Sequence, residues 1–446
     1  MEKTFARLTS GNYGSVGLFG LGRSNSAILD LIPRGTRVTL RSDRAVSLTG
    51  QQKDRIERVL IGDDALKDIG EELTVFSPSV RRERLGDALS RTVCTSDAEM
   101  FFGAVSAPVF AVSGSDGKST TATLAAELLR GKFPDLSLCG NIGRCMCAEL
   151  SPHRSAYAVE LSSFQLTYLR PEIYRAALTN ITPNHLDWHL NYHEYKNTKL
   201  SLLDGCREAV VSVDSEECMR AAIGRSLFGI ASAQHGFREL SKRLNAEVYY
   251  TAEGGQICRN GEPMLPLAGV KRKRGHELKN LLTALALTDG YADAERAVKV
   301  ASEFDGLPHR CRTVAAIDGV EYIDSSIDTS PARTAATLRT LGRRVTVLLG
   351  GRSKGMDFST LRQPLKEYCE RAILFGECRD EIESSLDGTV PTASFPRLGD
   401  AIDFAARNSS SGTVLLSPAA ASYDEFHSFE ERGDYFKTRI LSIKSK

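Results

Sequence analysis

The segment VFAVSGSDGKSTTATLAAELLRG, Val109 to Gly131, carries the clearest chemical pattern of the chain. An apolar strand pattern ends in a turn that contains Gly114, and a helical pattern begins at a Gly-Lys-Ser triplet. The standard phosphate loop GxxxxGK[ST] would need glycine where Val112 stands, so the spacing here is the shorter GxxGKST. Backbone N–H groups of such a turn, together with the N-terminus of the following helix, attract phosphate oxygens.

We therefore expect a nucleotide site in this turn. Lys118 would neutralise charge on the β- and γ-phosphates, and Ser119 or Thr120 would bind Mg²⁺. The predicted nucleotide-binding residues are Gly114, Ser115, Asp116, Gly117, Lys118, Ser119 and Thr120. The alternative is a capped helix after a tight turn, with Lys118 on the surface.

Two more chemically capable side chains follow apolar strand patterns. Glu160 ends "AYAVE", and His185 comes shortly after "AALTNI". Ligands of open α/β sheets collect at the carboxyl ends of the strands, so both side chains could converge on the phosphate loop. A carboxylate and an imidazole suit a Mg²⁺ site that bridges ATP and a substrate. Taken alone, Glu160 is more often a charge at a helix N-terminus and His185 a turn residue.

The segment YHEYKNTKLSLL contains Lys196 and Lys199. On an ordinary amphipathic helix both lysines would face outward. A reactive lysine needs a neutral amine, and hence surroundings that lower its pKa. The residues alone do not choose between the two lysines.

The elements around these residues repeat an α/β pattern. "SVGLFGLGRSNSAILDLI" and "GTRVTLRSD" form a βαβ opening, a second strand–loop–helix unit starts at Pro108, and short apolar strands recur after "DGLPHRC". We expect an α/β protein of three domains, over residues 1–106, 107–307 and 308–446. A chain of 446 residues is too long for a single core.

Composition excludes several classes of protein. Hydrophobic residues make up 41% and charged residues 25%, as in soluble globular proteins, and the net charge of +1 gives no field for nucleic acid or membrane. No apolar run is long enough to span a bilayer, and the first residues lack an apolar signal core. The ten cysteines form no CxxC pair. We expect a cytoplasmic protein with reduced thiols.

"GSDGKST" resembles the phosphate loop of the Mur ligases and folylpolyglutamate synthases, which are three-domain, ATP-dependent amide-bond formers. "VELSSFQL", "TNITPNHLDWH" and "GNIG" resemble further segments of that family. The resemblance implies that Glu160 and His185 bind magnesium and that Asn141 and Ser162 contact the substrate. It also implies that Lys199, rather than Lys196, is carbamylated by CO₂ and helps to hold a second Mg²⁺. In "GHELKNLLTALAL", Asn280 would lie near the adenine, and Glu277 stands where the family often has Asn.

The C-terminal third resembles the D-glutamate-adding members of the Mur ligases. "FDGLPHRCR" matches their domain junction, with Arg310 at the nucleotide, and "GVEYIDSSIDTSP" resembles a nucleotide-binding turn that favours Asp324 over Ser325. "VLLGGRSKGMDF" and "LLSPAAASYDEFHSFEERGDYF" resemble the segments that hold the amino acid. The implied D-glutamate contacts are Thr329, Lys354, Ser422 and Phe429.

In the N-terminal unit "GLFGLGRSN" approaches GxGxxG, with Asn25 in place of the third glycine, and no clean ribose-binding acid follows. A dinucleotide enzyme is therefore a poor interpretation. The resemblance implies a Rossmann-like domain that binds the UDP of a sugar nucleotide. The candidate contacts are Leu21, Arg23 and Ser24, and Arg81 and Arg82 are further basic residues that could face phosphate.

Together the resemblance implies a ligase that uses ATP and two Mg²⁺ ions to join D-glutamate to UDP-N-acetylmuramoyl-L-alanine, for peptidoglycan synthesis and thus cell shape and division. We expect a monomer without nucleic-acid or membrane partners. Two alternatives are an amide ligase of the folylpolyglutamate synthase type and a nucleotide-binding homologue without turnover.

Overall fold

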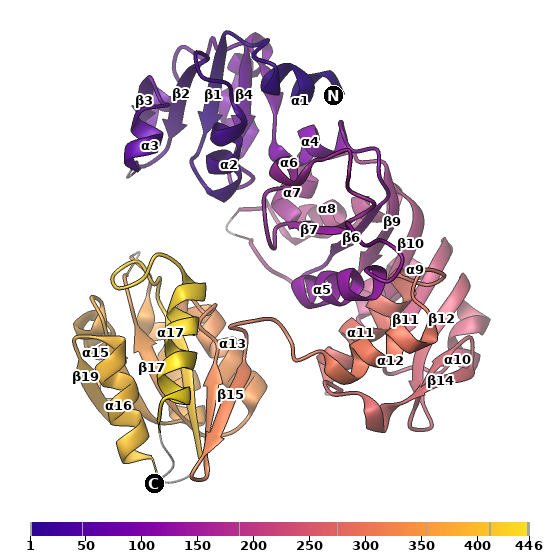
Figure 1. Ribbon diagram of the computed structural model, residues 1–446, viewed down its shortest axis with the longest axis vertical. Helices are drawn as coiled ribbons and strands as arrows, with labels where there is room; N and C mark the ends of the chain where they lie inside the picture. The colour runs from indigo at the N-terminus through magenta and orange to yellow at the C-terminus, as the bar shows by residue number, and fades with distance from the viewer. Residues whose placement is uncertain are drawn as a thin grey trace. The chain divides into compact units, whose positions relative to one another are not determined.

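The computed structural model describes residues 2–46, 48–186, 188–273, 275–353, 355–409 and 412–443. The chain divides into two compact units, Met1–Phe304 and Asp305–Lys446. The predicted α/β class is confirmed, because both units consist of sheets rich in parallel strands with helices packed against them (Figure 1). Every helix in these described ranges is too short or too polar to cross a bilayer.

The first unit begins with a five-stranded parallel sheet of order β3-β2-β1-β4-β5. Its strands are β1 (Ser15–Phe19), β2 (Arg37–Ser42), β3 (Arg58–Ile61), β4 (Leu73–Phe76) and β5 (Val93–Thr95). Its helices are α1 (Glu2–Thr9), α2 (Arg23–Leu31), α3 (Gly50–Lys53) and α4 (Asp97–Phe102), with 3₁₀ segments η1 (Gly62–Leu66) and η2 (Arg82–Arg91).

A nine-stranded sheet of order β14-β13-β12-β11-β10-β9-β6-β8-β7 follows in the same unit. The strands are β6 (Val109–Ser113), β7 (Ser137–Gly140), β8 (Tyr157–Glu160), β9 (Ile173–Leu178), β10 (Cys206–Ser212), β11 (Ser226–Ser232), β12 (Asn245–Glu253), β13 (Gln256–Arg259) and β14 (Glu262–Pro266). All pairs are parallel except β12–β13 and β13–β14, which add an antiparallel hairpin at one edge.

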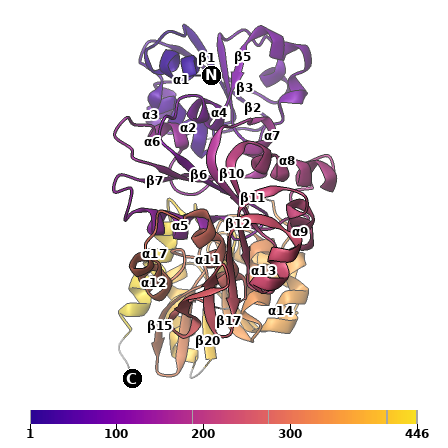
Figure 2. The same cartoon turned by 90° about the vertical axis from the view of Figure 1, so that its right-hand side faces the viewer.

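Helices cover both faces of this central sheet. They are α5 (Lys118–Leu129), α6 (Met146–Glu149), α7 (Ser163–Tyr168), α8 (Tyr192–Asp204), α9 (Glu216–Ala222), α10 (Phe237–Arg243), α11 (Gly275–Leu287) and α12 (Ala294–Glu303), with the 3₁₀ turn η3 (Leu267–Gly269). Helices α5 and α11 lie side by side on one face (Figure 2). Phe110 and Val112 of β6 point into the core beneath α5 and α11, whereas Val109 and Ala111 alternate to the opposite face, as strand geometry requires.

The two sheets of the first unit share one hydrophobic cluster. Phe101 of α4 packs edge-on against Tyr157 of β8, with ring centroids 5.1 Å apart. The buried Asp97 carboxylate accepts hydrogen bonds from the backbone N–H groups of Met146 and Cys147. This shared core explains why residues 1–304 form one compact unit although they contain two sheets.

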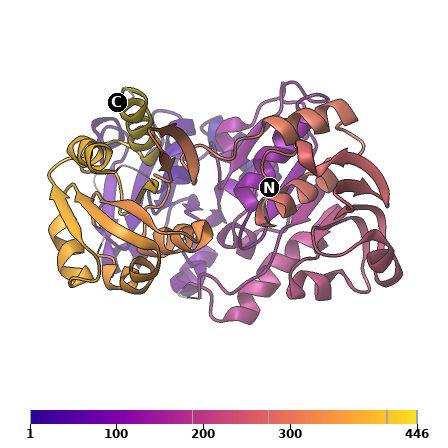
Figure 3. The ribbon, with the colours of Figure 1, turned by 90° about the horizontal axis from the view of Figure 1, so that it is seen from below.

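The second unit holds a six-stranded sheet of order β15-β16-β20-β17-β18-β19, parallel except for β15 (Figure 3). The strands are β15 (Arg312–Ile317), β16 (Val320–Asp324), β17 (Val345–Gly350), β18 (Cys369–Phe375), β19 (Thr392–Phe395) and β20 (Gly412–Ala419). The helical segments α13 (Pro331–Leu341), η4 (Phe358–Leu361), α14 (Arg362–Tyr368) and α15 (Arg379–Leu386) cover one face, and α16 (Leu398–Asn408) and α17 (Phe429–Leu441) cover the other.

Candidate active site

The turn between β6 and α5 has backbone geometry that only glycine accommodates at two points. Gly114 has a φ of +146°, and a Cβ there would lie 1.9 Å from the Thr179 hydroxyl oxygen. Gly117 has a φ of +77°, and a Cβ there would lie 2.2 Å from the Asn280 amide oxygen. A side chain at either position would therefore displace the loop. The predicted loop glycines are thus explained by close packing as well as by backbone conformation.

Asn180, which follows β9, fixes the first half of this loop. Its side-chain oxygen accepts the backbone N–H groups of Ser115 (3.0 Å) and Asp116 (2.8 Å). The Ser115 hydroxyl donates to the Thr182 carbonyl oxygen (2.9 Å) and lies 2.7 Å from the Tyr195 hydroxyl. The loop is therefore held in shape by residues from β9 and α8, and the sequence analysis did not single out Asn180.

The N-terminus of α5 presents Lys118, Ser119 and Thr120 in its first turn. The Lys118 ammonium donates to the Ser115 carbonyl oxygen (2.8 Å), which folds this side chain back over the loop. The alternative of a surface lysine is not what the structure shows, because Lys118 is half-buried. A positive charge thus stands beside the N-terminus of a helix, where phosphate oxygens would be stabilised.

Glu160, the last residue of β8, is fully buried and gathers two of the other predicted side chains. One carboxylate oxygen accepts the Ser119 hydroxyl (2.7 Å), and the other accepts the Asn141 amide (2.7 Å). Gly140 allows this approach, since a Cβ there would lie 2.3 Å from the Glu160 carbonyl oxygen. The predicted convergence of Glu160 on the phosphate loop is therefore present in the structure.

Lys199 lies on the inner face of α8 and is 2% exposed. Its ammonium nitrogen is 3.5 Å from the Ser113 hydroxyl. Burial lowers the pKa of Lys199 well below its usual value of 10.5, and the nearby positive charge of Lys118 lowers it further. The expectation that both lysines face outward is wrong for Lys199, whereas the half-buried Lys196 pairs with Glu217 (3.3 Å).

His185 lies in the exposed loop after β9, with a φ of +54°. Its ring lies 4.8 Å from that of Phe164, centroid to centroid. Over the ranges that the structure describes, no group of three or more His, Cys, Asp and Glu side chains is close enough to hold a metal ion. The buried Glu160 carboxylate and the Ser119 hydroxyl nevertheless supply hard oxygen ligands of the kind that Mg²⁺ prefers, leaving further positions for phosphate oxygens and water.

Asn280 is buried near the start of α11 and packs directly on Gly117, so the predicted adenine-side residue does adjoin the loop. Glu277, where the family often has Asn, forms an ion pair with Arg272. Thr120 lines a cavity together with Arg272 and Glu277. Ser162 caps α7 by accepting the Gln165 backbone N–H, so its side chain has a structural role as well.

In the N-terminal sheet, Arg23 begins α2 and donates to the Asn141 carbonyl oxygen (2.6 Å). Leu21 and Ser24 are half-buried beside it. The possibility that Arg81 and Arg82 face phosphate is not what the structure shows, since Arg81 pairs with Glu194 and Arg82 with Glu99. Arg23 therefore connects the predicted sugar-nucleotide side of the unit to the loop that holds Glu160.

In the second unit, Asp324 ends β16 and is buried. Its carboxylate accepts the Ser326 backbone N–H (2.9 Å) and lies 2.7 Å from His309 Nδ1, and this hydrogen bond raises the pKa of His309. The neighbouring Ser325 hydroxyl accepts the Cys311 backbone N–H instead (3.1 Å). Asp324 is thus the buried acid of this turn.

The other predicted residues of the second unit differ in exposure. Arg310 is exposed, Thr329 is half-buried, and Ser422 is 2% exposed in the turn after β20. Phe429 begins α17, where its carbonyl oxygen accepts the Ser326 hydroxyl (2.8 Å). Lys354 lies outside the described residues.

Comparison with known proteins agrees with this geometry. Residues 112–288 match the Mur ligase middle domain. A relative from Hahella chejuensis is 33% identical over 358 residues, 78% of each chain, and one from Legionella pneumophila strain Lens is 34% identical over 364 residues, 78% of this chain and 79% of the relative. The chain belongs to the Mur ligase family.

Within that family its relatives share one name. Both proteins above, and a Clostridium kluyveri protein that is 29% identical over 95% of each chain, are called UDP-N-acetylmuramoylalanine--D-glutamate ligase.

Solved structures support the fold. The chain resembles UDP-N-acetylmuramate-alanine ligase from Thermotoga maritima with a TM-score of 0.59 and 18% identity, covering 96% of this chain and 100% of that one. It also resembles the MurF ligase of Thermotoga maritima in complex with ADP, with a TM-score of 0.50 and 14% identity, covering 96% of this chain and 95% of that one. At these identities the likeness concerns the fold alone.

Proposed function

We propose that this protein is an ATP-dependent ligase that adds D-glutamate to UDP-N-acetylmuramoyl-L-alanine in peptidoglycan precursor synthesis. The observation that carries the proposal is the buried Glu160 carboxylate, bonded to Ser119 of the phosphate loop and to Asn141. Relatives above 30% identity that bear the name of this activity fix the choice among amide ligases.

The chemistry divides into two steps. The γ-phosphoryl group of ATP passes to the alanine carboxylate, which gives ADP and an acyl phosphate. The D-glutamate amine then attacks the acyl carbon, and the tetrahedral intermediate loses phosphate and a proton to leave the amide. Lys118 and the N-terminus of α5 would stabilise the charge that develops on the transferred phosphoryl group, so positioning and electrostatics do most of the work.

Magnesium would be held by Ser119 and Glu160, with His185 brought to it from the loop after β9. When bound, Mg²⁺ neutralises phosphate charge and orients the phosphoryl group. Asn141 would keep the Glu160 carboxylate aimed at the metal, as outer-shell partners do. Arg310, Asp324 and Asn280 complete the nucleotide contacts in this proposal.

We further propose that Lys199 is carbamylated and helps to hold a second Mg²⁺. A carbamate forms when a neutral amine adds to CO₂ and loses a proton, and burial lowers the pKa of Lys199, which favours the neutral amine. A buried carbamate would also bring a negative charge to the side of Lys118. D-Glutamate would be held by Thr329, Lys354, Ser422 and Phe429 of the second unit, and the sugar nucleotide by Leu21, Arg23, Ser24, Asn141 and Ser162. The reaction is assigned to a cytoplasmic monomer.

The test is phosphate release from ATP by the purified protein, with each substrate omitted in turn. Release should need both UDP-N-acetylmuramoyl-L-alanine and D-glutamate, and L-glutamate should not replace D-glutamate. Release with a folate substrate and glutamate would favour the folylpolyglutamate alternative. Nucleotide binding without release under any combination would favour the non-catalytic one.

A further inference from the structure

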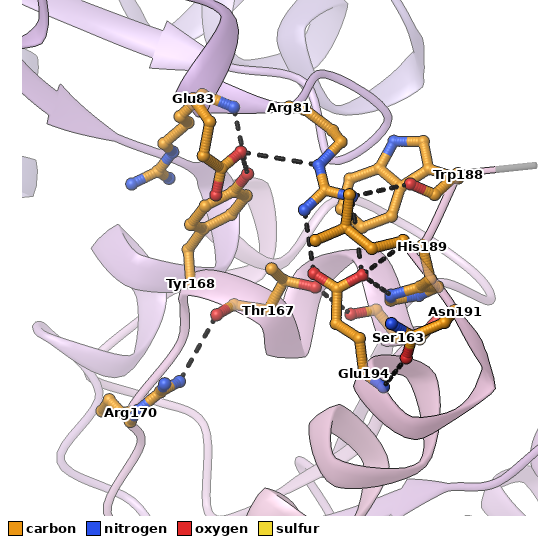
Figure 4. A network of polar contacts seen from close by, with 12 residues as sticks. Arg81, Glu83, Ser163, Thr167, Tyr168, Arg170, Trp188, His189, Asn191 and Glu194 are labelled. Carbon is orange, nitrogen blue, oxygen red and sulfur yellow. Dashed lines mark hydrogen bonds and ion pairs between the residues drawn. The ribbon is translucent and has the colours of Figure 1, made fainter. Parts of the chain in front are cut away.

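Two loops that are distant in the sequence meet at the side chains of Arg81 and Trp188 (Figure 4). One, here called the 77–82 loop, follows β4 of the first sheet. The other follows β9 of the central sheet and carries His185; its described residues, 182–186 and 188–191, are here called the 182–191 loop. Each continues directly into a helical segment, η2 and α8 respectively. Both loops lie within the first compact unit.

Arg81 is the side chain that joins them. Its guanidinium donates to the Trp188 carbonyl oxygen (2.9 Å) and to the Glu194 carboxylate (2.8 Å), and it stands 5.0 Å from the Trp188 ring centroid. The Trp188 indole N–H donates in return to the Ser79 carbonyl oxygen (2.7 Å). Each loop thus donates a hydrogen bond to a backbone carbonyl of the other, and a cation covers the indole face.

Trp188 is in turn tied to His185. The backbone N–H groups of Trp188 (3.1 Å) and His189 (3.0 Å) both donate to the His185 carbonyl oxygen. The Phe164 ring lies 4.8 Å from both the His185 and the Trp188 rings. A shift of Trp188 would therefore move the backbone turn that places His185.

Glu194 extends the same connection to α8. It stands in the first turn of that helix, and its carboxylate accepts the Leu190 backbone N–H (2.5 Å) as well as Arg81. The same helix carries Lys199, five residues further on. Arg81 thus contacts both the 182–191 loop, which carries His185, and the start of α8, which carries Lys199.

His189 shows that the 182–191 loop needs such support. The ring is buried between Phe164, Trp188 and Tyr195. Among the described residues neither ring nitrogen has a hydrogen-bond partner, and Nδ1 lies 3.6 Å from a Glu194 carboxylate oxygen. Burial of a polar group without a hydrogen bond costs free energy, and the Glu194 carboxylate that faces this ring is the one that Arg81 binds.

We infer that Arg81 is a positioning residue that couples the 77–82 loop to the His185 loop, so that sugar-nucleotide binding at the first sheet and magnesium binding at the phosphate loop strengthen each other. The inference rests on the proposed function, which places the sugar nucleotide at the first sheet and Mg²⁺ near His185. The coupling is reciprocal, since a ligand that favours the docked loop must be favoured by it in turn.

The chain contains a single tryptophan, Trp188, so its intrinsic fluorescence reports on this loop directly. We would titrate UDP-N-acetylmuramoyl-L-alanine and, separately, Mg²⁺ with ADP, and follow emission together with binding heats. Four variants are compared with the wild type: Arg81→Met, Glu194→Gln, the double variant that combines these two changes, and the control Arg84→Met. Arg84 is exposed in η2 and pairs only at the surface with Asp43.

In the wild type each ligand should change Trp188 emission, and each should lower the dissociation constant of the other ligand. In Arg81→Met and Glu194→Gln the Mg²⁺ concentration for half-saturation should rise about tenfold, as on loss of an outer-shell partner, and the mutual tightening should vanish. The double variant should be no worse than Arg81→Met, because both changes break one connection. Arg84→Met should behave as the wild type.

Unchanged Mg²⁺ half-saturation and retained mutual tightening in Arg81→Met would overturn the inference. If Arg81→Met unfolds, Arg81→Lys keeps the charge without the two-pronged geometry and should show the same loss of coupling. Because ADP binding needs no turnover, these measurements hold even if no D-glutamate is added. Failure of the ligase assay with coupling intact would count against the proposed function alone.

Discussion

Lys199 is the residue whose surroundings differ most from what its type favours. Its side chain lies in a stripe formed with Tyr195, Leu202 and Leu203, all buried on one side of α8. Among the described residues Lys199 has no charged partner within hydrogen-bond distance, and its side-chain nitrogen lies 3.5 Å from the Ser113 hydroxyl. An unneutralised ammonium there would be costly, so the amine is neutral or chemically altered.

Lys199→Met should therefore stabilise the protein while abolishing ligation. Because the folded-state pKa is below 10.5, the unfolded chain binds the proton more readily, and wild-type stability rises with pH up to that value. Methionine removes this dependence. In CO₂-free buffer we expect a higher Tm for Lys199→Met near pH 7 and a smaller difference near pH 9.

The control is Lys196→Met, which lies on the same helix and pairs with Glu217 at its outer side. It should leave the pH dependence of Tm as in the wild type, and it should change the rate of phosphate release by no more than about twofold. A Lys199→Met variant with wild-type activity would remove Lys199 from the mechanism.

At residue scale, resemblance identified Glu160, Asn141 and Ser119, and the structure brings these three into hydrogen-bond contact. The choice of Lys199 over Lys196 came from the resemblance, because the spacing of the residues alone did not distinguish the two lysines. No sequence pattern pointed to Asn180, and Arg81 was considered as a residue that faces phosphate rather than as one that joins two loops. Their roles depend on partners more than sixty residues away in the chain, which no local pattern encodes.

At the scale of elements, the phosphate loop is held ready by the ends of neighbouring strands. Asn180 and Thr179 follow β9, which pairs with β6, so their side chains reach the loop that β6 leads into. Thr179 donates to the Asp116 carbonyl oxygen (2.7 Å). A loop fixed before the nucleotide arrives loses little conformational freedom on binding.

Asn180→Ala should loosen this loop. It removes the side-chain acceptor of the Asp116 backbone N–H and one of the two acceptors of the Ser115 N–H, which keeps its bond to the Asn180 backbone carbonyl oxygen (2.9 Å). We therefore expect a loss of about 1–3 kcal/mol in stability and a higher KM for ATP. Urea unfolding and steady-state kinetics measure the two effects. The matched control is Asn197→Ala, an exposed asparagine of α8 that contacts only His193.

If Asn180→Ala raised the KM for D-glutamate as much as the KM for ATP, the effect of the substitution would not be confined to the phosphate loop.

The strand and helix order of the central sheet was predictable because the apolar runs and glycine turns are strong local signals. The hairpin β13–β14 was not predicted, since "GGQICRNGEPMLP" is short and its strands alternate weakly.

At the scale of the whole molecule, the sequence predicts three domains, and the described residues form three sheets in two compact units. The first two sheets share a hydrophobic cluster, which includes Phe101 against Tyr157. The third sheet has cores of its own on both faces. Gly306 and Pro308 lie close to the boundary between the two units, which falls between Phe304 and Asp305. No composition signal reveals a shared core.

Expression of separate fragments distinguishes two compact units from three independently folding domains. Residues 305–446 expressed alone should give cooperative thermal unfolding by circular dichroism, because both faces of their sheet are covered by their own helices. Residues 1–106 alone should unfold without cooperativity, since Asp97 and Phe101 would lose their partners. Cooperative unfolding of both fragments would mean that three domains fold separately.

The hairpin at the edge of the central sheet has a consequence for the behaviour of the protein in concentrated solution. Strand β14 is a sheet edge, and it reads Glu-Pro-Met-Leu-Pro from Glu262 to Pro266. Proline donates no backbone hydrogen bond, and a register shift interrupts β13 between Ile257 and Cys258. A second molecule therefore finds few donors to pair with at this edge, and the sheet cannot readily be extended there into an aggregate.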